Sequence, residues 1–335
     1  MESAPPRPES NRTVRLLAAV LDVMALATLA LALVVALVRQ PPPRPVKAVP
    51  ERVLVVAAEG FCWPILTPAL LSGRTPALAG LAAKRRARIV LPPGGRPGTF
   101  WTAAALVRGA PPGSGAGSTG GLPLWEALAR KGERLALVNW PVSSEGLGRE
   151  RHETRLLPRS DQELPAVVPE RPVARDLPPL MALRLSKDRR VVSLALRAHS
   201  VHVPGVLLVG FHGPFSPDGP PRADHLVSPP ARYWELLDAE VARLLGGLPP
   251  RTAVVLVGRG LGPPGGPGAD GLLALSGPGF SAGPVTDPLG VDELGPLVLR
   301  LVGRPLPLGL AALPPGSLFE PPWARSHPVR WESLP

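Results

Sequence analysis

Residues able to do chemistry follow three apolar, β-branched runs of this chain. Glu59 follows the run RVLVVAA, His212 follows GVLLVGF, and Arg259 follows TAVVLVG. In open α/β sheets, ligands bind outside the carboxyl ends of the strands, so these positions are the first candidates for a site. A carboxylate and an imidazole suit zinc or manganese, whereas a guanidinium binds anions.

More candidate ligands lie in the segment after His212, which contains Asp218, Asp224 and His225. Together with Glu59, these side chains could form a site for a single metal ion. The alternative is that they are solvated loop residues, because three prolines in the same segment interrupt regular secondary structure. Both interpretations stay open from the sequence.

Arg259 places a fixed positive charge at the end of its run. A guanidinium there can bind an anion, or it can pair with Glu59 if both runs end at the same edge of one sheet. The simpler alternative is an arginine that points into solvent. A separation above ~6 Å between the two side chains would exclude the pair, because an ion pair needs close approach.

Strands and helices alternate along the chain, and this alternation predicts the architecture. Strands are expected at 52–58, 134–140, 205–211 and 252–258, and helices at 124–132 and 232–247. Short runs that are apolar throughout are typical of strands buried on both faces. We therefore predict a three-layer α/β/α sandwich around a largely parallel sheet, preceded by one transmembrane helix.

The transmembrane prediction rests on residues 16–38, where Asp22 is the only charged side chain. A helix of this length spans ~35 Å, enough for a ~30 Å hydrocarbon core. A stop of Arg39, Gln40 and prolines follows it, rather than the small-residue cleavage site of a signal peptide. Basic residues flank both ends, so they do not specify orientation. The bilayer is thus the expected partner, in a single-pass arrangement.

The remaining boundaries follow from composition. We expect an N-terminal tail (1–15), the span (16–38) and a proline-rich linker (39–51). An α/β domain (52–310) follows, with an irregular proline- and arginine-rich insertion (143–190), and then a proline-rich C-terminal tail (311–335).

The overall composition limits the function classes. A net charge of +11 would ordinarily suggest nucleic acid, but the basic residues are scattered and lack interleaved aromatic residues. We therefore expect no nucleic-acid partner, and attraction to anionic lipid headgroups fits the charge better. The single cysteine, Cys62, excludes an internal disulfide framework and a cysteine-rich zinc site.

Seven segments, taken in order, resemble the alkaline phosphatase superfamily, specifically its type I phosphodiesterase/nucleotide pyrophosphatase-like branch. The closest is LWEALARKGERLALVNWPV, a helix followed by a strand that ends in Trp-Pro-Val. The seven segments lie at 52–63, 100–115, 124–142, 206–214 with 232–245, 252–260, 271–283 and 291–307. The resemblance implies two divalent cations, held by Asp and His ligands, that clamp a phosphoryl group beside a Ser or Thr nucleophile.

The sequence departs from that pattern at its first two functional segments. Glu59 stands in place of the first aspartate and is one methylene longer. The nucleophile position ahead of Trp101 is Pro97, which has no hydroxyl. Thr99 and Thr102 are nearby, but their offsets differ from those of the family.

The later segments depart as well. Ser114-Gly115 replaces a His-Gly pair, the aspartate after the third strand falls near Phe215, and Gly258-Arg259-Gly260 replaces a Ser-Asp-His-Gly run. The expected site is therefore a vestigial cleft, with no catalytic residue assigned and no metal ligand set. Its members are Glu59, Thr99, Thr102, His212, Asp218 and Arg259.

These departures favour a membrane-anchored pseudoenzyme that acts as a scaffold or anion-binding module without a cofactor. The alternative is an active phosphoesterase or sulfoesterase with a rearranged site for zinc or manganese. A third hypothesis is an enzyme subunit that transfers phosphorylated headgroups at the membrane. That reaction would need the same missing nucleophile. An extracytoplasmic position follows by analogy only, and no motif points to a protein partner.

Overall fold

The structure is a computed structural model of the full chain, and it divides the chain into two compact units, Met1–Val46 and Lys47–Pro335. The residues that it describes are 20–22, 24–28, 50–58, 60–84, 86–90, 106–107, 122–140, 154–157, 176–213, 231–258, 271–283, 288–308, 310 and 313–332.

In the first unit, residues 20–22 and 24–28 are helical and their side chains are exposed. Most of the expected span at 16–38 lies outside the described residues. Within the described ranges, none of the helices combines the length and the apolar character that crossing a bilayer requires.

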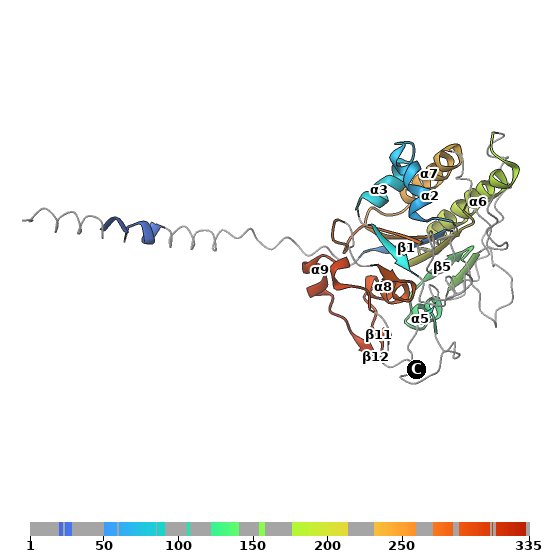
Figure 1. Ribbon diagram of the computed structural model, residues 1–335. Coiled ribbons are helices and arrows are strands. Elements are labelled where there is room, and N and C mark those ends of the chain that lie inside the picture. The colour runs from blue at the N-terminus through green and yellow to red at the C-terminus, as the bar shows by residue number, and fades with distance from the viewer. Residues whose placement is uncertain are drawn as a thin grey trace, which may run out of the picture. The chain divides into compact units, whose positions relative to one another are not determined.

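The second unit is built on a sheet, of which β1 and β5 are labelled in Figure 1. Its eight described strands run in the order β10-β2-β9-β8-β1-β7-β5-β6. The bounds of these strands, in chain order, are β1 Arg52–Ala58, β2 Arg86–Val90, β5 Leu135–Val138, β6 Thr154–Leu157, β7 Val206–Phe211, β8 Thr252–Gly258, β9 Gly271–Ser276 and β10 Leu289–Gly290. The four central strands β8, β1, β7 and β5 are mutually parallel. Strand β9 pairs antiparallel with β8, and β6 pairs antiparallel with β5.

The central strands are buried along their length, as their uninterrupted apolar runs predict. Parallel strands need helices on both faces of the sheet, since each crossover connection packs against one face. Alternate side chains of β1, such as Val55 and Val56, therefore enter two different hydrophobic clusters. The sheet is mixed but mostly parallel, which confirms the predicted α/β class.

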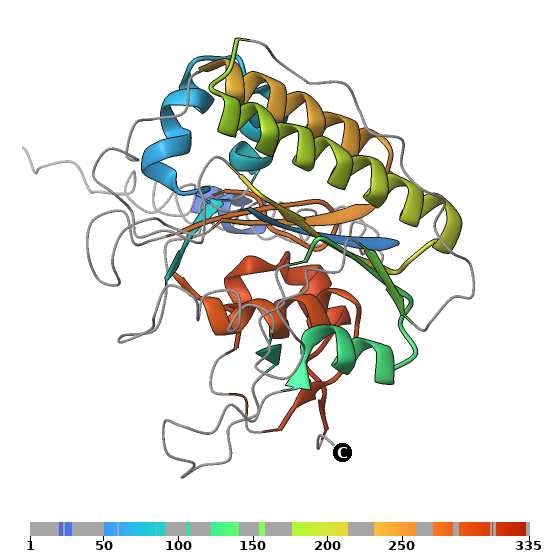
Figure 2. The ribbon, with the colours of Figure 1, turned by 90° about the vertical axis from the view of Figure 1, so that its right-hand side faces the viewer.

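Helices cover both faces of the sheet (Figure 2). One layer contains α2 (Trp63–Leu71), α3 (Pro76–Lys84), α6 (Pro179–His202) and α7 (Ala231–Gly246), and the other contains α5 (Leu124–Arg130), α8 (Leu294–Leu301) and α9 (Pro321–Ser326). Short elements complete the described chain: β3 (Leu106–Val107) with β4 (Leu122–Pro123), β11 (Leu306–Pro307) with β12 (Trp331–Glu332), and the 3₁₀ turns Val291–Glu293 and Gly316–Leu318.

Helices α6 and α7 pack side by side and are joined by polar contacts. Glu240 on α7 accepts hydrogen bonds from Arg189 on α6 (2.9 Å) and from Arg243 (2.8 Å). Arg243 also donates to the hydroxyl of Ser193 (3.1 Å). Two pairs of matched positions, 189 with 240 and 193 with 243, fix the register of the two helices.

Asp238 of α7 ties α3 to the same layer. Its carboxylate accepts the backbone N–H groups of Ala77 (3.2 Å) and Leu78 (2.7 Å) at the start of α3. The first N–H groups of a helix have no partner within the helix, so this side chain from another element supplies the cap.

The segment expected to be irregular, 143–190, contains more regular structure than its composition indicates. Strand β6 lies within it, and α6 begins at Pro179. A proline is compatible with the first turn of a helix because the N–H that it lacks has no partner there. Of the arginines in this part of α6, Arg184 is buried and Arg190 is exposed.

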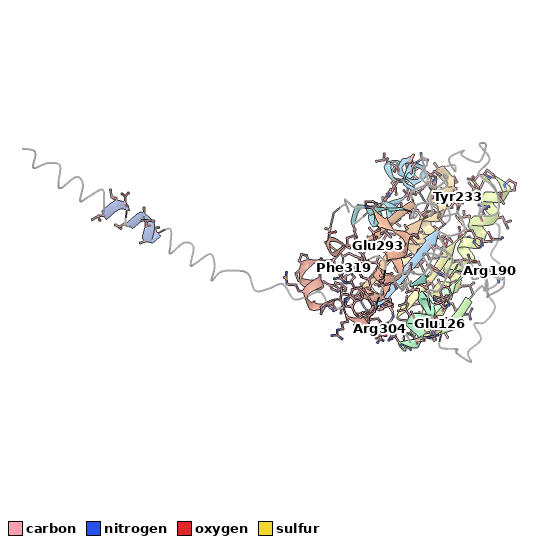
Figure 3. The ribbon with its side chains drawn as sticks, turned by 60° about the horizontal axis from the view of Figure 1, so that its bottom comes forward. Glu126, Arg190, Tyr233, Glu293, Arg304 and Phe319 are labelled. Atoms are coloured by element: carbon pink, nitrogen blue, oxygen red, sulfur yellow. The ribbon has the colours of Figure 1, made fainter. Side chains whose placement is uncertain are left out.

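The C-terminal segment also packs, although its prolines indicated a tail. Phe319 and Trp323 stack at 4.8 Å, His327 stacks on Trp323 at 4.6 Å, and the guanidinium of Arg300 lies 4.1 Å from the Phe319 ring centroid. Trp323 is fully buried and lies, with Phe319 (Figure 3), in the hydrophobic cluster of the α8 layer. The α/β domain thus continues past residue 310 to include 313–332.

Candidate functional site

The carboxyl ends of β5 and β7 lie next to each other, because the two strands are parallel and pair in register. Asn139 follows β5 with a φ of 47°. This left-handed conformation is uncommon outside glycine, but asparagine adopts it more readily than most residues. The Asn139 side-chain amide donates to the carbonyl of Gly210 in β7 at 2.6 Å, so it fastens the two strand ends together.

His212 follows β7 and contacts a single carboxylate, Asp188 of α6. The His212 backbone N–H donates to Asp188 Oδ1 at 2.6 Å, and the imidazole Nδ1 lies 3.0 Å from the same oxygen. The backbone N–H of Gly213 donates to Asp188 Oδ2 at 3.2 Å. Gly213 has a φ of 62°, which a residue without a Cβ adopts at no steric cost.

Asp188 is completely buried, and both of its oxygens are used by these contacts. Burial raises the pKa of the Asp188 carboxyl, and the hydrogen bonds and charge of His212 offset that effect only in part. Three N–H donors converge on the two oxygens, which suits the ionised carboxylate as an acceptor. Asp188 therefore holds the turn after β7 in its conformation.

The contact with Asp188 also sets the tautomer of His212. In the neutral ring, a hydrogen bond to Asp188 requires the proton on Nδ1, which leaves Nε2 without one. The His212 side chain is 20% exposed. The Asn139 amide nitrogen lies 3.5 Å from Nδ1 and is already used on Gly210, so it does not compete for that proton.

The carboxyl ends of β1 and β8 meet a different surface. Gly258, the last residue of β8, packs directly against the backbone and Cβ of Phe61, just beyond the end of β1. Phe61 is fully buried and forms an edge contact with Trp234 of α7 at 5.4 Å between ring centroids. An apolar side chain therefore covers this part of the strand edge.

Beneath the turn lies a second polar group that the sequence did not single out. Arg184 of α6 is 8% exposed, and Tyr233 is fully buried. Among the described residues, neither Nη1 of Arg184 nor the hydroxyl of Tyr233 has a hydrogen-bond partner. Burial raises the pKa of the Tyr233 phenol well above its ordinary value; the charge of Asp188 adds to that effect and the charge of Arg184 opposes it.

Of the six sequence-predicted site residues, the structure describes His212 at the carboxyl edge of the sheet. The other five lie outside the described residues: Glu59, Thr99, Thr102, Asp218 and Arg259. Asp224 and His225 lie outside them too, as does the suggested Glu59–Arg259 pair. These predictions stay predictions.

The sequence did carry a signal for Asp188. The apolar positions Leu185, Val192 and Ala195 repeat at helical spacing, and Asp188 falls in the same buried stripe. A carboxylate in the apolar stripe of a helix indicates a buried partner, because an unpaired buried charge is costly. The same reasoning applies to Tyr233, which lies in the buried face of α7.

The described side chains do not fit the zinc or manganese that the family resemblance implies. Within the described ranges, no group of three or more His, Cys, Asp or Glu side chains could hold a metal ion. Both oxygens of Asp188 accept N–H groups of the turn after β7, and His212 alone is a single ligand. A bound divalent ion needs several such ligands arranged around it.

The sheet with a layer of helices on each face defines a three-layer α/β/α sandwich. Among solved structures, a putative sulfatase from Bacteroides thetaiotaomicron VPI-5482 matches with a TM-score of 0.52 and 14% sequence identity. The match covers 78% of this chain and 73% of the Bacteroides chain. At this identity the likeness establishes the fold alone. Comparison by sequence finds no matching protein family and no matching curated protein.

Proposed function

We propose that this chain is a membrane-tethered domain that has lost metal-dependent ester hydrolysis and acts as a scaffold or anion-binding module. The observation that carries this proposal is the use made of Asp188. It is the buried carboxylate at the edge of the sheet where ligands bind in this class of fold, and its oxygens hold backbone N–H groups of His212 and Gly213.

The sequence at the other strand ends supports the same proposal. The resemblance to the type I phosphodiesterase branch calls for an aspartate after the first strand and an aspartate–histidine pair after β8. This chain has Glu59 and Arg259 at those places, and Pro97 at the nucleophile position. Two-metal hydrolysis needs negative or neutral ligands around the cations, and a guanidinium repels them.

The packing at Gly258 is a further argument. The end of β8 lies flush against Phe61, whose buried ring belongs to the hydrophobic cluster between the sheet and α7. An apolar contact of this kind stabilises the fold by removing area from water, and it supplies no ligand. At this part of the strand edge, Phe61 therefore contributes to the hydrophobic core and not to a ligand site.

Metal content tests this proposal. The full-length chain, purified in a mild detergent, is incubated with zinc or manganese, freed of unbound ion by gel filtration and analysed by elemental mass spectrometry. We expect substoichiometric metal for both ions, because the described ligands are committed to backbone donors. Stoichiometric retention of either ion would contradict the proposal.

One observation favours the alternative of an active esterase. The imidazole of His212 is oriented by a buried carboxylate, with Nε2 left unprotonated, and this arrangement also serves histidines that ligate metals or transfer protons. Under that alternative, a phosphate or sulfate ester would be hydrolysed in a metal-dependent reaction, and His212→Ala would abolish it. Asp176→Ala, at an exposed carboxylate, would leave the rate unchanged and serves as the control.

The tether is the second part of the proposal and rests on the apolar segment 16–38. We expect the full chain to stay in the membrane pellet after an alkaline carbonate wash and to be released by detergent. A chain that lacks residues 16–38 should be released by the wash, since ~23 apolar residues supply the anchoring free energy. Release of the full chain by carbonate would contradict the tether.

A further inference from the structure

Arg184 and Tyr233 lie at the same level on two neighbouring helices. The contacts of Arg189 with Glu240 and of Ser193 with Arg243 set the register of α6 and α7. Counting five residues back from Arg189 on α6, and the same number back from Glu240 on α7, brings Arg184 close to the first turn of α7. That turn contains Tyr233. Tyr233 is labelled in Figure 3, and Arg184 belongs to α6, which packs beside α7.

The guanidinium of Arg184 lacks the partner that its burial requires. Arginine stays charged in proteins, and taking a charge out of water is unfavourable by several kcal/mol unless it is paired. Arg184 is 8% exposed, and its Nη1 is without a hydrogen bond in the described part of the chain. The carboxylate one turn further along α6, Asp188, is already occupied by His212 and Gly213.

The hydroxyl of Tyr233 is in the same situation. It is fully buried, and the residues that the structure describes supply no hydrogen-bond partner for it. Besides burial, the charges of Asp188 and Arg184 act on the pKa of its phenol in opposite directions. A buried donor without an acceptor is rare in native proteins and indicates that a water, an ion or a ligand supplies one.

The surrounding backbone favours a negative ligand. The N-terminal ends of α6 and α7 carry the positive end of each helix dipole, and neither helix has an acidic residue in its first turn. Nothing in those first turns therefore neutralises the charge of Arg184. A tetrahedral oxyanion offers several acceptor oxygens, which suits donors that approach from two different helices.

We infer that Arg184 and Tyr233 form a binding site for a compact tetrahedral oxyanion, a phosphate or sulfate group, between the second turn of α6 and the first turn of α7. This inference rests on the proposed function, because it gives the anion-binding module a site. The guanidinium supplies the charge and up to two parallel hydrogen bonds, and the phenol supplies a third donor. The group can be a free ion or the headgroup of a phosphorylated molecule.

Binding by the full-length chain in detergent tests the inference. Equilibrium dialysis with radiolabelled inorganic phosphate measures affinity at fixed ionic strength, and inorganic sulfate, glycerol 3-phosphate and acetate serve as competitors. We expect phosphate and sulfate to compete at concentrations where acetate and chloride do not. Stronger competition by glycerol 3-phosphate than by phosphate would indicate a headgroup ligand, and equal competition would indicate a free ion.

Three variants separate the site from general charge effects. Arg184→Met should weaken phosphate binding by about tenfold or more, and Tyr233→Phe by roughly tenfold, because each removes a hydrogen bond to a charged group. Lys187→Met removes a surface charge from the same helix and should bind like the wild type. In chloride alone, Arg184→Met should unfold at the same temperature as the wild type or higher, since an unpaired buried charge is gone.

The inference is overturned if the wild type does not distinguish phosphate or sulfate from chloride, or if Arg184→Met binds phosphate as the wild type does. If Arg184→Met does not fold, Tyr233→Phe decides, and unchanged binding by that variant contradicts the site. Hydrolysis of an ester would count against the proposed function and leave this site standing. Absence of phosphate binding would count against the site and leave the loss of hydrolysis standing.

Discussion

Replacing Asp188 with alanine is expected to lower the free energy of unfolding by about 3–5 kcal/mol, the range found when one partner of a buried ionic contact is removed. The substitution leaves the backbone N–H groups of His212 and Gly213 buried without an acceptor and releases the imidazole. Urea or guanidinium unfolding followed by far-ultraviolet circular dichroism measures the change.

The matched control is Asp176→Ala. Asp176 is 61% exposed and pairs with Arg232, itself 52% exposed, at 3.4 Å. Surface ion pairs contribute about 0–1 kcal/mol, so this variant should unfold almost as the wild type does. A loss in Asp188→Ala no larger than that of the control would show that Asp188 does not hold the turn after β7.

The effect of Asp188 should also depend on pH, and the sign follows from the raised pKa. Because the pKa of Asp188 is higher in the folded chain than in the unfolded chain, the folded state binds the proton more tightly. The contribution of this group to stability is then greatest below the ordinary aspartate pKa of about 4, and it decreases as the pH rises through the native value. The stability difference between wild type and Asp188→Ala should therefore be larger in acid than at neutral pH.

Gly258→Ala is the second substitution with a large expected effect. A methyl group at this position would overlap the carbonyl oxygen and the Cβ of Phe61. Backbone atoms cannot move aside as a flexible side chain can, so the strand end or the turn after β1 must shift. We expect a loss of about 3 kcal/mol or more in the free energy of unfolding, at the upper end of overpacking effects.

Gly80→Ala provides the control for Gly258→Ala. Gly80 lies inside α3 and is exposed, and a methyl group there meets no other atom within 4 Å. Because alanine is the better helix former, this substitution should stabilise the chain by about 0.5–1 kcal/mol. Equal stability of the Gly258 and Gly80 variants would contradict the close contact between β8 and Phe61.

Much of the sheet could be predicted from the sequence because its central strands are buried on both faces. The runs at 52–58, 205–211 and 252–258 have no polar residue to interrupt them, and they became β1, β7 and β8 with almost the same bounds. Helix α7 was predicted from its amphipathic period and its closing glycines. Local pattern and tertiary position agree in these elements.

Helix α6 was missed because its burial pattern mixes charged residues into both faces. Arg184 and Asp188 are buried while Leu180 and Leu183 are exposed, so hydrophobicity alone gives the wrong periodicity. The long-range partners that satisfy Asp188 come from the turn after β7 and cannot be found from the local sequence. Of the candidate site predicted at the carboxyl edge of the sheet, the structure describes His212, and the site itself stays a prediction.

The most direct test of the lost hydrolysis is turnover by the full-length chain. An aryl phosphate, an aryl phosphodiester and an aryl sulfate are incubated with the protein in the presence of zinc or manganese, and release of the phenol is followed by absorbance. We predict a rate equal to that of the same metal solution without protein. Metal-dependent turnover that is lost in His212→Ala and retained in Asp176→Ala would contradict this account and establish the chain as an esterase.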